Sequence, residues 1–333
     1  MRLDPVKELD AGANAAAARE MQGQRVGFVL MLAFFALGPF LIYPVFLMKV
    51  MCFALFACAF NLLIGYVGLL SFGHAMFMGI AGYTAAHAAK VWGLTPELAI
   101  VAGAAAASLL GLVSGLIAIR RQGIYFAMIT LALAQMVYFF CVQAPFTGGE
   151  DGIQAVPRGR LFGLVDLSNV WAMYSTVFAV FVGGFLLIYR IIHSPFGQVL
   201  KAIRENEARA ISLGYDTDRY KLLAFVLSAG LSGVAGAMNA LVFQLAALNA
   251  VHWTMSGEVV LMTLVGGLGT VFGPVVGALV VLAMENYLAQ LGAWVTIVQG
   301  LIFILCVLTF RRGIVGELAA KLRVPLGAWP SGR

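Results

Sequence analysis

The stretch VMCFALFACAFNLLIGYVGLL, residues 50–70, decides the fold class. It contains no Asp, Glu, Lys or Arg and is as long as the roughly 20 apolar residues that a helix needs to cross the hydrocarbon core of a membrane. Its apolar residues are continuous, whereas a membrane-spanning β-strand alternates apolar and polar residues over ~10-residue segments. The stretch therefore predicts a membrane-spanning α-helix.

The composition of the whole chain indicates the same class. The 333 residues are 62% hydrophobic and 11% charged, with a mean hydropathy of +0.95, whereas a soluble domain is about 45–50% apolar and about 25% charged. So few polar side chains do not cover a soluble core of this size. Four cysteines are too few for a disulfide-stabilised scaffold. We expect a polytopic membrane protein.

Apolar segments of spanning length recur along the chain and predict an all-α helical bundle of about ten spans. An even number of spans places both termini on one side of the membrane. We expect a cytosolic N-terminal tail at 1–25, a transmembrane domain at 26–310 and a cytosolic C-terminal tail at 311–333. The predicted spans are 26–47, 50–70, 74–91, 97–118, 123–143, 170–191, 220–243, 256–273, 275–291 and 294–310.

The basic residues orient the predicted bundle. With both termini in the cytosol, all but four of the 21 Lys and Arg residues lie on the cytosolic side, as the positive-inside rule requires. The exceptions are Lys49, Lys90, Arg158 and Arg160. The net charge of +6 then reflects orientation and attraction to anionic membrane lipid, so no nucleic-acid partner is expected.

Two glycine clusters predict broken helices. One lies in GYVGLLSFGHAMFMGIAGY, residues 65–83, and the other in VGGLGTVFGPVVGA, residues 265–278. Close helix packing explains many of these glycines, but consecutive glycines and a following proline interrupt a helix. Unwound backbone within a membrane is tolerated where protein buries it or where it lines a wet cavity, so packing alone and packing with pathway lining both stay open. The pathway and helix-break candidates are Gly68, Gly73, His74, Gly266, Gly267, Gly269, Pro274 and Glu285.

Catalytic and metal-binding chemistry is not indicated. The histidines and cysteines show no metal-ligand spacing, no nucleophile–base pairing is recognisable, and neither HExxH nor GxxxxGK[ST] occurs. We therefore expect no enzyme, no metal and no cofactor on this chain. Glu285 is open to two interpretations: an intramembrane carboxylate in a functional site, or one that hydrogen-bonds to Asn or Gln on a neighbouring helix.

One long cytosolic loop carries HSPFGQVLKAIRENEARAISLGYDTDR, residues 193–219. Ser194 and Pro195 are typical of a helix start and Gly214 of a helix end, and the apolar spacing predicts one amphipathic helix of about 16 residues. A lipid-bound helix is one alternative, but its mixed charge favours a groove on a partner protein. The candidate coupling residues are Lys201, Arg204, Glu205, Glu207, Ala208 and Gly214.

Three of these stretches together resemble a known family. They are NLLIGYVGLLSFGHAMFMGIAGYTAA (61–86), SPFGQVLKAIRENEARAISLGYDTDRYKLLAF (194–225) and VVLMTLVGGLGTVFGPVVGA (259–278). Over about residues 50–316 the chain is similar to the permease subunits of branched-chain amino acid ABC importers, of the LivM type. The resemblance implies a multi-pass protein of the bacterial inner membrane that translocates branched-chain amino acids.

The same resemblance implies a set of partners. A second homologous permease chain, two ATP-binding subunits that hold ATP and Mg²⁺, and a periplasmic substrate-binding protein would complete the importer. The loop 194–214 would correspond to the segment that docks on the ATPases. The periplasmic loop 144–169 would face the binding protein, and its docking candidates are Glu150, Asp151, Arg158 and Arg160.

Other functions remain open from the sequence. The nearest alternative is a related ABC permease for urea, short amides or other small solutes. A secondary transporter driven by an ion gradient, with Glu285 as the ion site, would need no ATPase. A membrane scaffold without transport would tolerate mutation of the glycine breaks.

Overall fold

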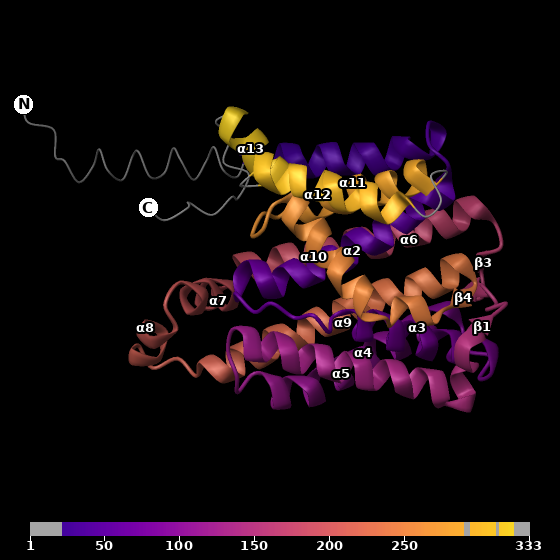
Figure 1. The fold of residues 1–333 in the computed structure, drawn as a ribbon. Helices are drawn as coiled ribbons and strands as arrows, with labels where there is room; N and C mark the ends of the chain where they lie inside the picture. Colours follow the sequence, from indigo (N-terminus) through magenta and orange to yellow (C-terminus); the bar gives the residue numbers. More distant parts are fainter. Residues whose placement is uncertain (1–21, 290–293, 311–312, 323–333) are drawn as a thin grey trace, which may run out of the picture.

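The computed structural model describes residues 22–289, 294–310 and 313–322, and these form a bundle of α-helices (Figure 1). Six helices are long and apolar enough to cross a membrane: Gln22–Phe40, α2 (Pro44–Tyr66), α4 (Pro96–Ala118), α5 (Ile124–Gln143), α6 (Val170–His193) and α9 (Thr217–Phe243). Shorter helices complete the bundle: α3 (Ala75–Lys90), α10 (Trp253–Gly266), α11 (Gly273–Leu288) and α12 (Val295–Thr309). The expected all-α polytopic class is confirmed, while the count of ten spans and the side of the termini stay predictions.

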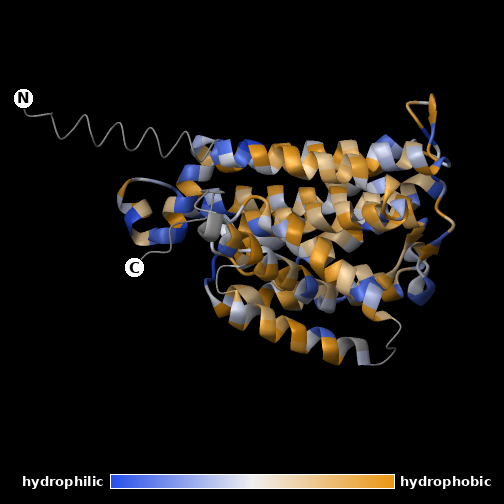
Figure 2. Ribbon diagram, turned by 90° about the horizontal axis from the view of Figure 1, so that it is seen from above, coloured by the Kyte–Doolittle hydropathy of each residue, from blue (hydrophilic) through white to orange (hydrophobic). Residues whose placement is uncertain are grey.

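Hydrophobic residues dominate the helices, and hydrophilic residues gather toward the two ends of the bundle (Figure 2). On α4, for example, Val101, Leu109 and Leu116 are more than half exposed although they are apolar. An exposed apolar surface of this extent is unfavourable in water. It suits the hydrocarbon of a bilayer, which supports a multi-pass membrane protein.

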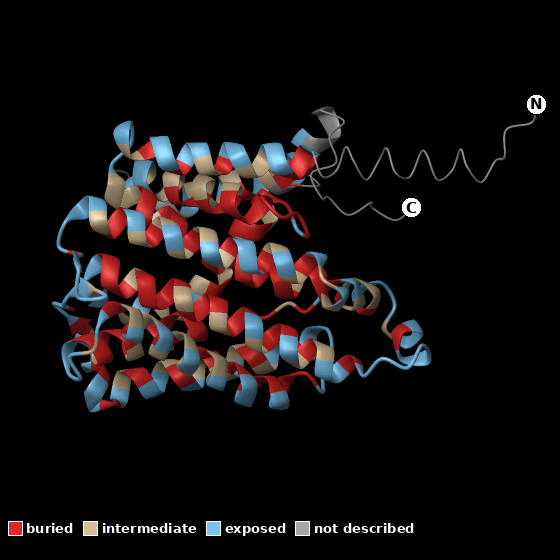
Figure 3. Ribbon diagram, turned by 180° about the vertical axis from the view of Figure 1, so that it is seen from behind, coloured by how far each residue is buried: buried red, intermediate tan, exposed pale blue. Residues whose placement is uncertain are grey.

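Helix α2 lies at the centre of the bundle. In its most apolar window 89% of the residues are buried, compared with 28% in α4, and α2 contacts α6, α9, α10 and α11. A helix that is hydrophobic on all sides is favoured in such an interior position. Buried residues are concentrated on the inner helices in Figure 3, and the stretch that predicted a span forms part of this core.

Several predicted boundaries are wrong. The first helix ends at Phe40 and α2 begins at Pro44, because proline at the first helical position starts a helix and cannot continue one. Lys49 therefore lies inside α2 and not in an outer loop. The predicted span 256–273 is also wrong, since α10 ends at Gly266 and Gly267 has a φ of +123°.

The two ends of the bundle differ. Helices α7 (Pro195–Glu205) and α8 (Glu207–Ser212) project from one end, and the strands lie at the other, which we call the strand end (Figure 1). There β1 (Ile153–Gln154) pairs antiparallel with β4 (Leu245–Ala246), and β2 (Arg160–Leu161) with β3 (Val165–Asp166). Short 3-10 turns are Gly38–Phe40, Pro145–Thr147, Gly149–Asp151 and Leu248–Ala250.

The cytosolic segments differ from the sequence prediction in two respects. The single amphipathic helix is divided into α7 and α8, because Asn206 is extended (φ −158°) and its side chain accepts the N–H of Arg209 as a new N-cap. The predicted C-terminal tail contains α13 (Gly313–Leu322), which contacts α10 and α11. The remainder of that tail and most of the N-terminal tail lie outside the described residues.

Candidate translocation and coupling sites

The predicted break at the second glycine cluster is confirmed at residues 267–272, between α10 and α11. Asn61 of α2 satisfies the freed backbone: its Oδ1 accepts the N–H of Gly269 at 3.0 Å, and its Nδ2 donates to the carbonyl of Thr270 at 2.9 Å. Asn61 is 2% exposed. Because an unpaired backbone group in a membrane costs several kcal/mol, this side chain stabilises the interruption.

Glycines around this break allow close backbone contacts. A Cβ on Gly266 would overlap the carbonyl of Gly273, and a Cβ on Gly277 would overlap the carbonyl of Met262. Gly269 has a φ of +71°, which residues with a Cβ rarely adopt. Pro274 lies in the first turn of α11, where its missing N–H costs nothing.

The first glycine cluster contains a second interruption, at residues 67–74 between α2 and α3. Gly68 has a φ of +83°. Gly73 packs against α5, since a Cβ there would overlap the carbonyl of Thr130. The N–H of Ala75, at the start of α3, donates to Ser256 Oγ of α10 at 2.9 Å, so the end of this interruption is joined to the helix that precedes the other one.

His74 is fully buried among Phe56, Phe60, Phe77 and Phe225. Its Nε2 lies 2.8 Å from Ser228 Oγ, which itself donates to the carbonyl of Ala59. The serine hydrogen is thus already used, so Nε2 is the donor and Nδ1 is unprotonated. Within the described residues Nδ1 has no hydrogen-bond partner. His74 therefore joins α3 to α2 and α9.

Arg204 connects α7 to both interruptions. Its Nη1 donates to the carbonyl oxygen of Gly65, near the end of α2. Its Cγ lies 3.1 Å from the position of a Cβ on Gly68, and its Nη1 lies 3.3 Å from that on Gly269. A guanidinium at the C-terminal end of a helix is electrostatically favourable. Arg204 thus lies against residues of both glycine-rich segments.

Glu207 faces the bundle rather than free solvent. It accepts hydrogen bonds from Lys221, from Thr217 at 3.2 Å and from Gln122 at 2.8 Å. The side chain of Lys221 is 3% exposed, so this pair fixes the start of α8 to α9. Charged groups this buried are stable when they are paired.

The other coupling candidates lie around this pair. The Lys201 ammonium is 5.8 Å from the ring centre of Tyr66, within the range of a cation–π contact. Glu205, Ala208 and Gly214 are exposed, and Gly214 has a φ of +90°. The structure thus brings Lys201 and Arg204 together at the end of α2, while Glu205, Ala208 and Gly214 face outward.

Apolar side chains are exposed at the tip of this projection. Ile211 is 56% exposed, Leu213 68% and Tyr215 40%. We call these three residues the apolar tip. The sequence predicted one amphipathic helix through this region and did not single out the tip, which lies beyond the kink at Asn206.

The loop at the strand end separates the four docking candidates. Glu150, Asp151 and Arg160 are exposed. Arg158 instead donates to the carbonyl of Val242 at 2.7 Å, close to the end of α9. Arg158 therefore fixes the loop to the bundle.

The same loop contains a local turn at Asp166. The N–H of Ser168 donates to the Asp166 carboxylate at 2.9 Å and holds the pKa of that carboxyl below its ordinary value.

Glu285 has a partner that the sequence did not suggest. Its carboxylate lies 3.5 Å from the ammonium of Lys49 on α2, whereas one of the two interpretations of Glu285 paired it with Asn or Gln. Glu258 of α10 lies close enough to interact electrostatically with both groups. These charges come together because α2, α10 and α11 pack side by side.

The comparisons with known proteins agree with this architecture. The profile of the family described as "Branched-chain amino acid transport system / permease component" matches residues 42–307. The chain belongs to this family. It is a transport permease subunit and not an enzyme. The matched residues of this branched-chain amino acid permease family member include both glycine interruptions, α7 and α8.

The individual relatives are permeases as well, for branched-chain amino acids and, more distantly, for a sugar. The high-affinity branched-chain amino acid permease protein LivM of Escherichia coli is 25% identical over 84% of this chain and 71% of its own length. A probable LivM of Methanocaldococcus jannaschii is 30% identical over 52% and 51%. The ribose import permease protein RbsC of Bacillus subtilis is 26% identical over 67% and 70%. No solved structure matches significantly.

Sequence reasoning missed several residues of these sites. Asn61, Ser228 and Lys49 lie in apolar helices, and each contacts another part of the interior. Such residues can be recognised in the sequence as polar side chains inside an apolar run. A polar side chain in that position needs a partner in the interior. The identity of the partner does not follow from spacing.

Proposed function

We propose that this chain is a membrane-spanning subunit of an ABC importer that moves branched-chain amino acids across the bacterial inner membrane. The family supports the permease role, and the LivM relatives support this substrate class. One observation supports the proposal that ATP hydrolysis on partner subunits drives transport. Arg204 joins the projecting α7 to both interruptions in the bundle.

The partners follow from the two ends of the bundle. Two ATPase subunits, with ATP and Mg²⁺, would bind the α7–α8 projection, with the apolar tip as the main contact. A second permease chain would complete the membrane part. A periplasmic binding protein would deliver substrate at the strand end, where Glu150, Asp151 and Arg160 are available for electrostatic steering.

The mechanism is alternating access. Closure of the ATPases moves α7 and α8, which contact each other, together with the start of α9, to which Glu207 and Lys221 fix α8. Arg204 transmits this movement to the carbonyl of Gly65 and to the segments at 67–74 and 267–272. Those segments lack regular helical hydrogen bonds, so they change shape at lower cost than an intact helix.

Reconstitution tests this proposal. The chain is purified with its partner subunits, placed in sealed vesicles with the binding protein, and assayed for uptake of leucine, urea and ribose with and without ATP. We expect ATP-dependent leucine uptake. Uptake by this chain alone, driven by an ion gradient, would instead favour the secondary transporter with Glu285.

Docking is tested separately at the apolar tip. Leu213→Asp should reduce co-purification of the ATPases, because a charge is poorly accommodated in an apolar interface. Phe162→Asp is the matched control, since Phe162 is 73% exposed at the strand end. Equal co-purification of both variants with the wild type would refute docking at the tip.

A further inference from the structure

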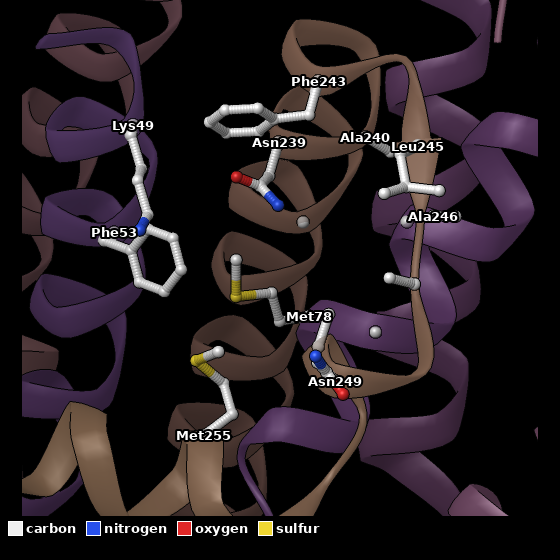
Figure 4. A pocket seen from close by; sticks show the side chains of 15 residues that line it. Lys49, Phe53, Met78, Asn239, Ala240, Phe243, Leu245, Ala246, Asn249 and Met255 are labelled. Atoms are coloured by element: carbon white, nitrogen blue, oxygen red, sulfur yellow. The ribbon is translucent and has the colours of Figure 1, made fainter. Parts of the chain in front are cut away.

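A cavity of about 350 Å³ lies among α2, α3, α9 and the start of α10, toward the strand end (Figure 4). Its floor is buried, with Met78 1% and Ala240 2% exposed, whereas Phe243 and Leu245 at the rim are 40% and 37% exposed. This volume lies at the lower end of the range for small-molecule sites, about 300–1,000 Å³. It suits one small solute.

Irregular backbone forms one wall of this cavity. After Phe243 the chain returns along α9 from Leu245 past Ala246 to Asn249 (Figure 4). Gln244, the residue at the reversal, has a φ of +55°, which costs energy for a residue with a side chain. Irregular backbone within a membrane is tolerated where it lines a cavity. Leu245, Ala246 and Asn249 of this segment all line the cavity.

Two polar groups face the cavity from opposite walls. Asn239 Oδ1 is buried and, among the described residues, has no hydrogen-bond partner. Lys49 lies opposite, on α2 (Figure 4). Its ammonium is held only loosely by Glu285, at 3.5 Å, and two of its three N–H donors remain for another acceptor. An unpaired buried acceptor is unfavourable unless a ligand supplies the donor.

The rest of the lining is apolar. Phe53, Met78, Phe243 and Met255 enclose the space between the two polar groups. Glu285 balances the charge of Lys49 and Glu258 lies nearby, which disfavours a purely anionic ligand. A sugar or urea would leave most of its donors and acceptors unpaired against these side chains. A zwitterion with an apolar side chain satisfies both polar groups.

We propose that this cavity is a receiving site for a zwitterionic amino acid with an apolar side chain. Lys49 binds the carboxylate, Asn239 Oδ1 accepts a hydrogen bond from the ammonium, and the methionines and phenylalanines contact the side chain. The strand pair β1–β4 connects the rim at Leu245 and Ala246 to the loop 144–169. Delivered substrate thus enters beside the docking loop. This inference rests on the proposed function and adds a substrate site to it.

Direct binding tests the site. The importer is assembled with its partner subunits but without the binding protein, and binding of radiolabelled leucine is measured by equilibrium dialysis. We expect leucine binding that isoleucine and valine compete for and that ribose and urea do not. Loss of one charge-assisted hydrogen bond in Lys49→Met, or of the acceptor in Asn239→Leu, should weaken binding about tenfold or more.

Matched variants separate the site from general damage. Lys90→Met removes an ammonium at the same end of the bundle that bonds to the carbonyl of Gln154 outside the cavity, and should bind leucine normally. Ala247→Phe narrows the cavity from its partly exposed wall and should weaken it. Thermal unfolding of each purified variant shows which ones fold.

The outcomes also distinguish the site from the proposed function. Wild-type binding in folded Lys49→Met and Asn239→Leu would overturn the site, as would competition by ribose equal to that by valine. Absence of leucine binding to an importer that imports leucine would overturn it as well and leave the proposed function standing. Failure of the complete importer to import leucine would overturn the proposed function.

Discussion

Asn61 and Gly269 are far apart in the sequence, yet the Asn61 carboxamide oxygen accepts the Gly269 N–H at 3.0 Å. The same carboxamide donates to the carbonyl of Thr270. One side chain thus replaces two backbone hydrogen bonds that the interruption after α10 removes. A buried, water-poor interior makes this replacement necessary.

Removal of this carboxamide should destabilise the bundle. Asn61→Leu keeps a similar side-chain size but leaves the N–H of Gly269 and the carbonyl of Thr270 without their partner, at about 1–3 kcal/mol for each group. Thermal unfolding in detergent should show a clearly lower midpoint. Thr84→Val is the control, because the Thr84 hydroxyl bonds within its own helix to Ile80 at 2.8 Å. Equal midpoints for both variants would contradict this role.

Gly277 should not tolerate a methyl group. In Gly277→Ala the new Cβ would overlap the Met262 carbonyl, and overpacking of this kind costs about 1–3 kcal/mol. Gly300→Ala is the control, since no atom of the described residues lies within 4 Å of a Cβ there. We expect reduced expression and a lower unfolding midpoint for the first variant alone. Similar behaviour of the two would show that α10 and α11 are not closely packed.

The Glu207–Lys221 pair should contribute to stability, whereas a nearby pair should not. Glu207→Gln leaves the ammonium of Lys221 buried without a countercharge, at about 3 kcal/mol or more. Arg219→Gln removes an exposed pair with Asp216, with side chains 83% and 52% exposed, worth about 0–1 kcal/mol. Denaturation of the two variants should differ accordingly. A larger loss in Arg219→Gln would contradict the interior role of Glu207.

Arg204 should matter for coupling more than for assembly. Arg204→Met breaks the hydrogen bond to the Gly65 carbonyl, and loss of such a charged hydrogen bond corresponds to about a tenfold effect or more. We expect the ATPases to co-purify normally while leucine uptake per ATP hydrolysed falls by that factor. Arg209→Met is the control, because Arg209 is exposed on α8.

The result that would contradict this role is equally specific. If Arg204→Met retained normal uptake per ATP, α7 would not act through Gly65. If Arg204→Met and Arg209→Met lost the ATPases to the same extent, both arginines would belong to a docking surface instead.

The apolar runs and glycine patterns allowed much of the fold to be predicted. Continuous apolar segments predicted an all-α membrane bundle, and Gly266-Gly267 with Pro274 predicted the break before α11, which is confirmed. These features are local, because helix propensity and backbone freedom depend on neighbouring residues. Helix ends were less predictable, because apolar residues continue on both sides of the turn before Pro44. Lys49 was therefore expected between two spans, whereas it lies inside α2.

The direction in which a polar side chain faces did not follow from the sequence. The mixed charge of residues 193–219 suggested an outward-facing partner surface, yet Arg204 and Glu207 bond to the bundle. A single bend at Asn206 decides which residues face outward. The apolar periodicity does not encode that bend, because the bend depends on the cap that the Asn206 side chain forms with the N–H of Arg209.

The sequence by itself determined that this protein lies in a membrane, that its helices are interrupted at two glycine-rich segments, and that it belongs with permeases. The first two properties follow from the free energy of transfer of apolar residues into lipid and from local backbone conformation. The third follows from the resemblance of the glycine-rich and loop motifs to that family. Only the tertiary structure decided that Asn61 stabilises one interruption, that Arg204 reaches both, and that Lys49 and Asn239 face one cavity. Each of these pairs residues far apart in the chain, and such pairs are selected by packing, which no local pattern specifies.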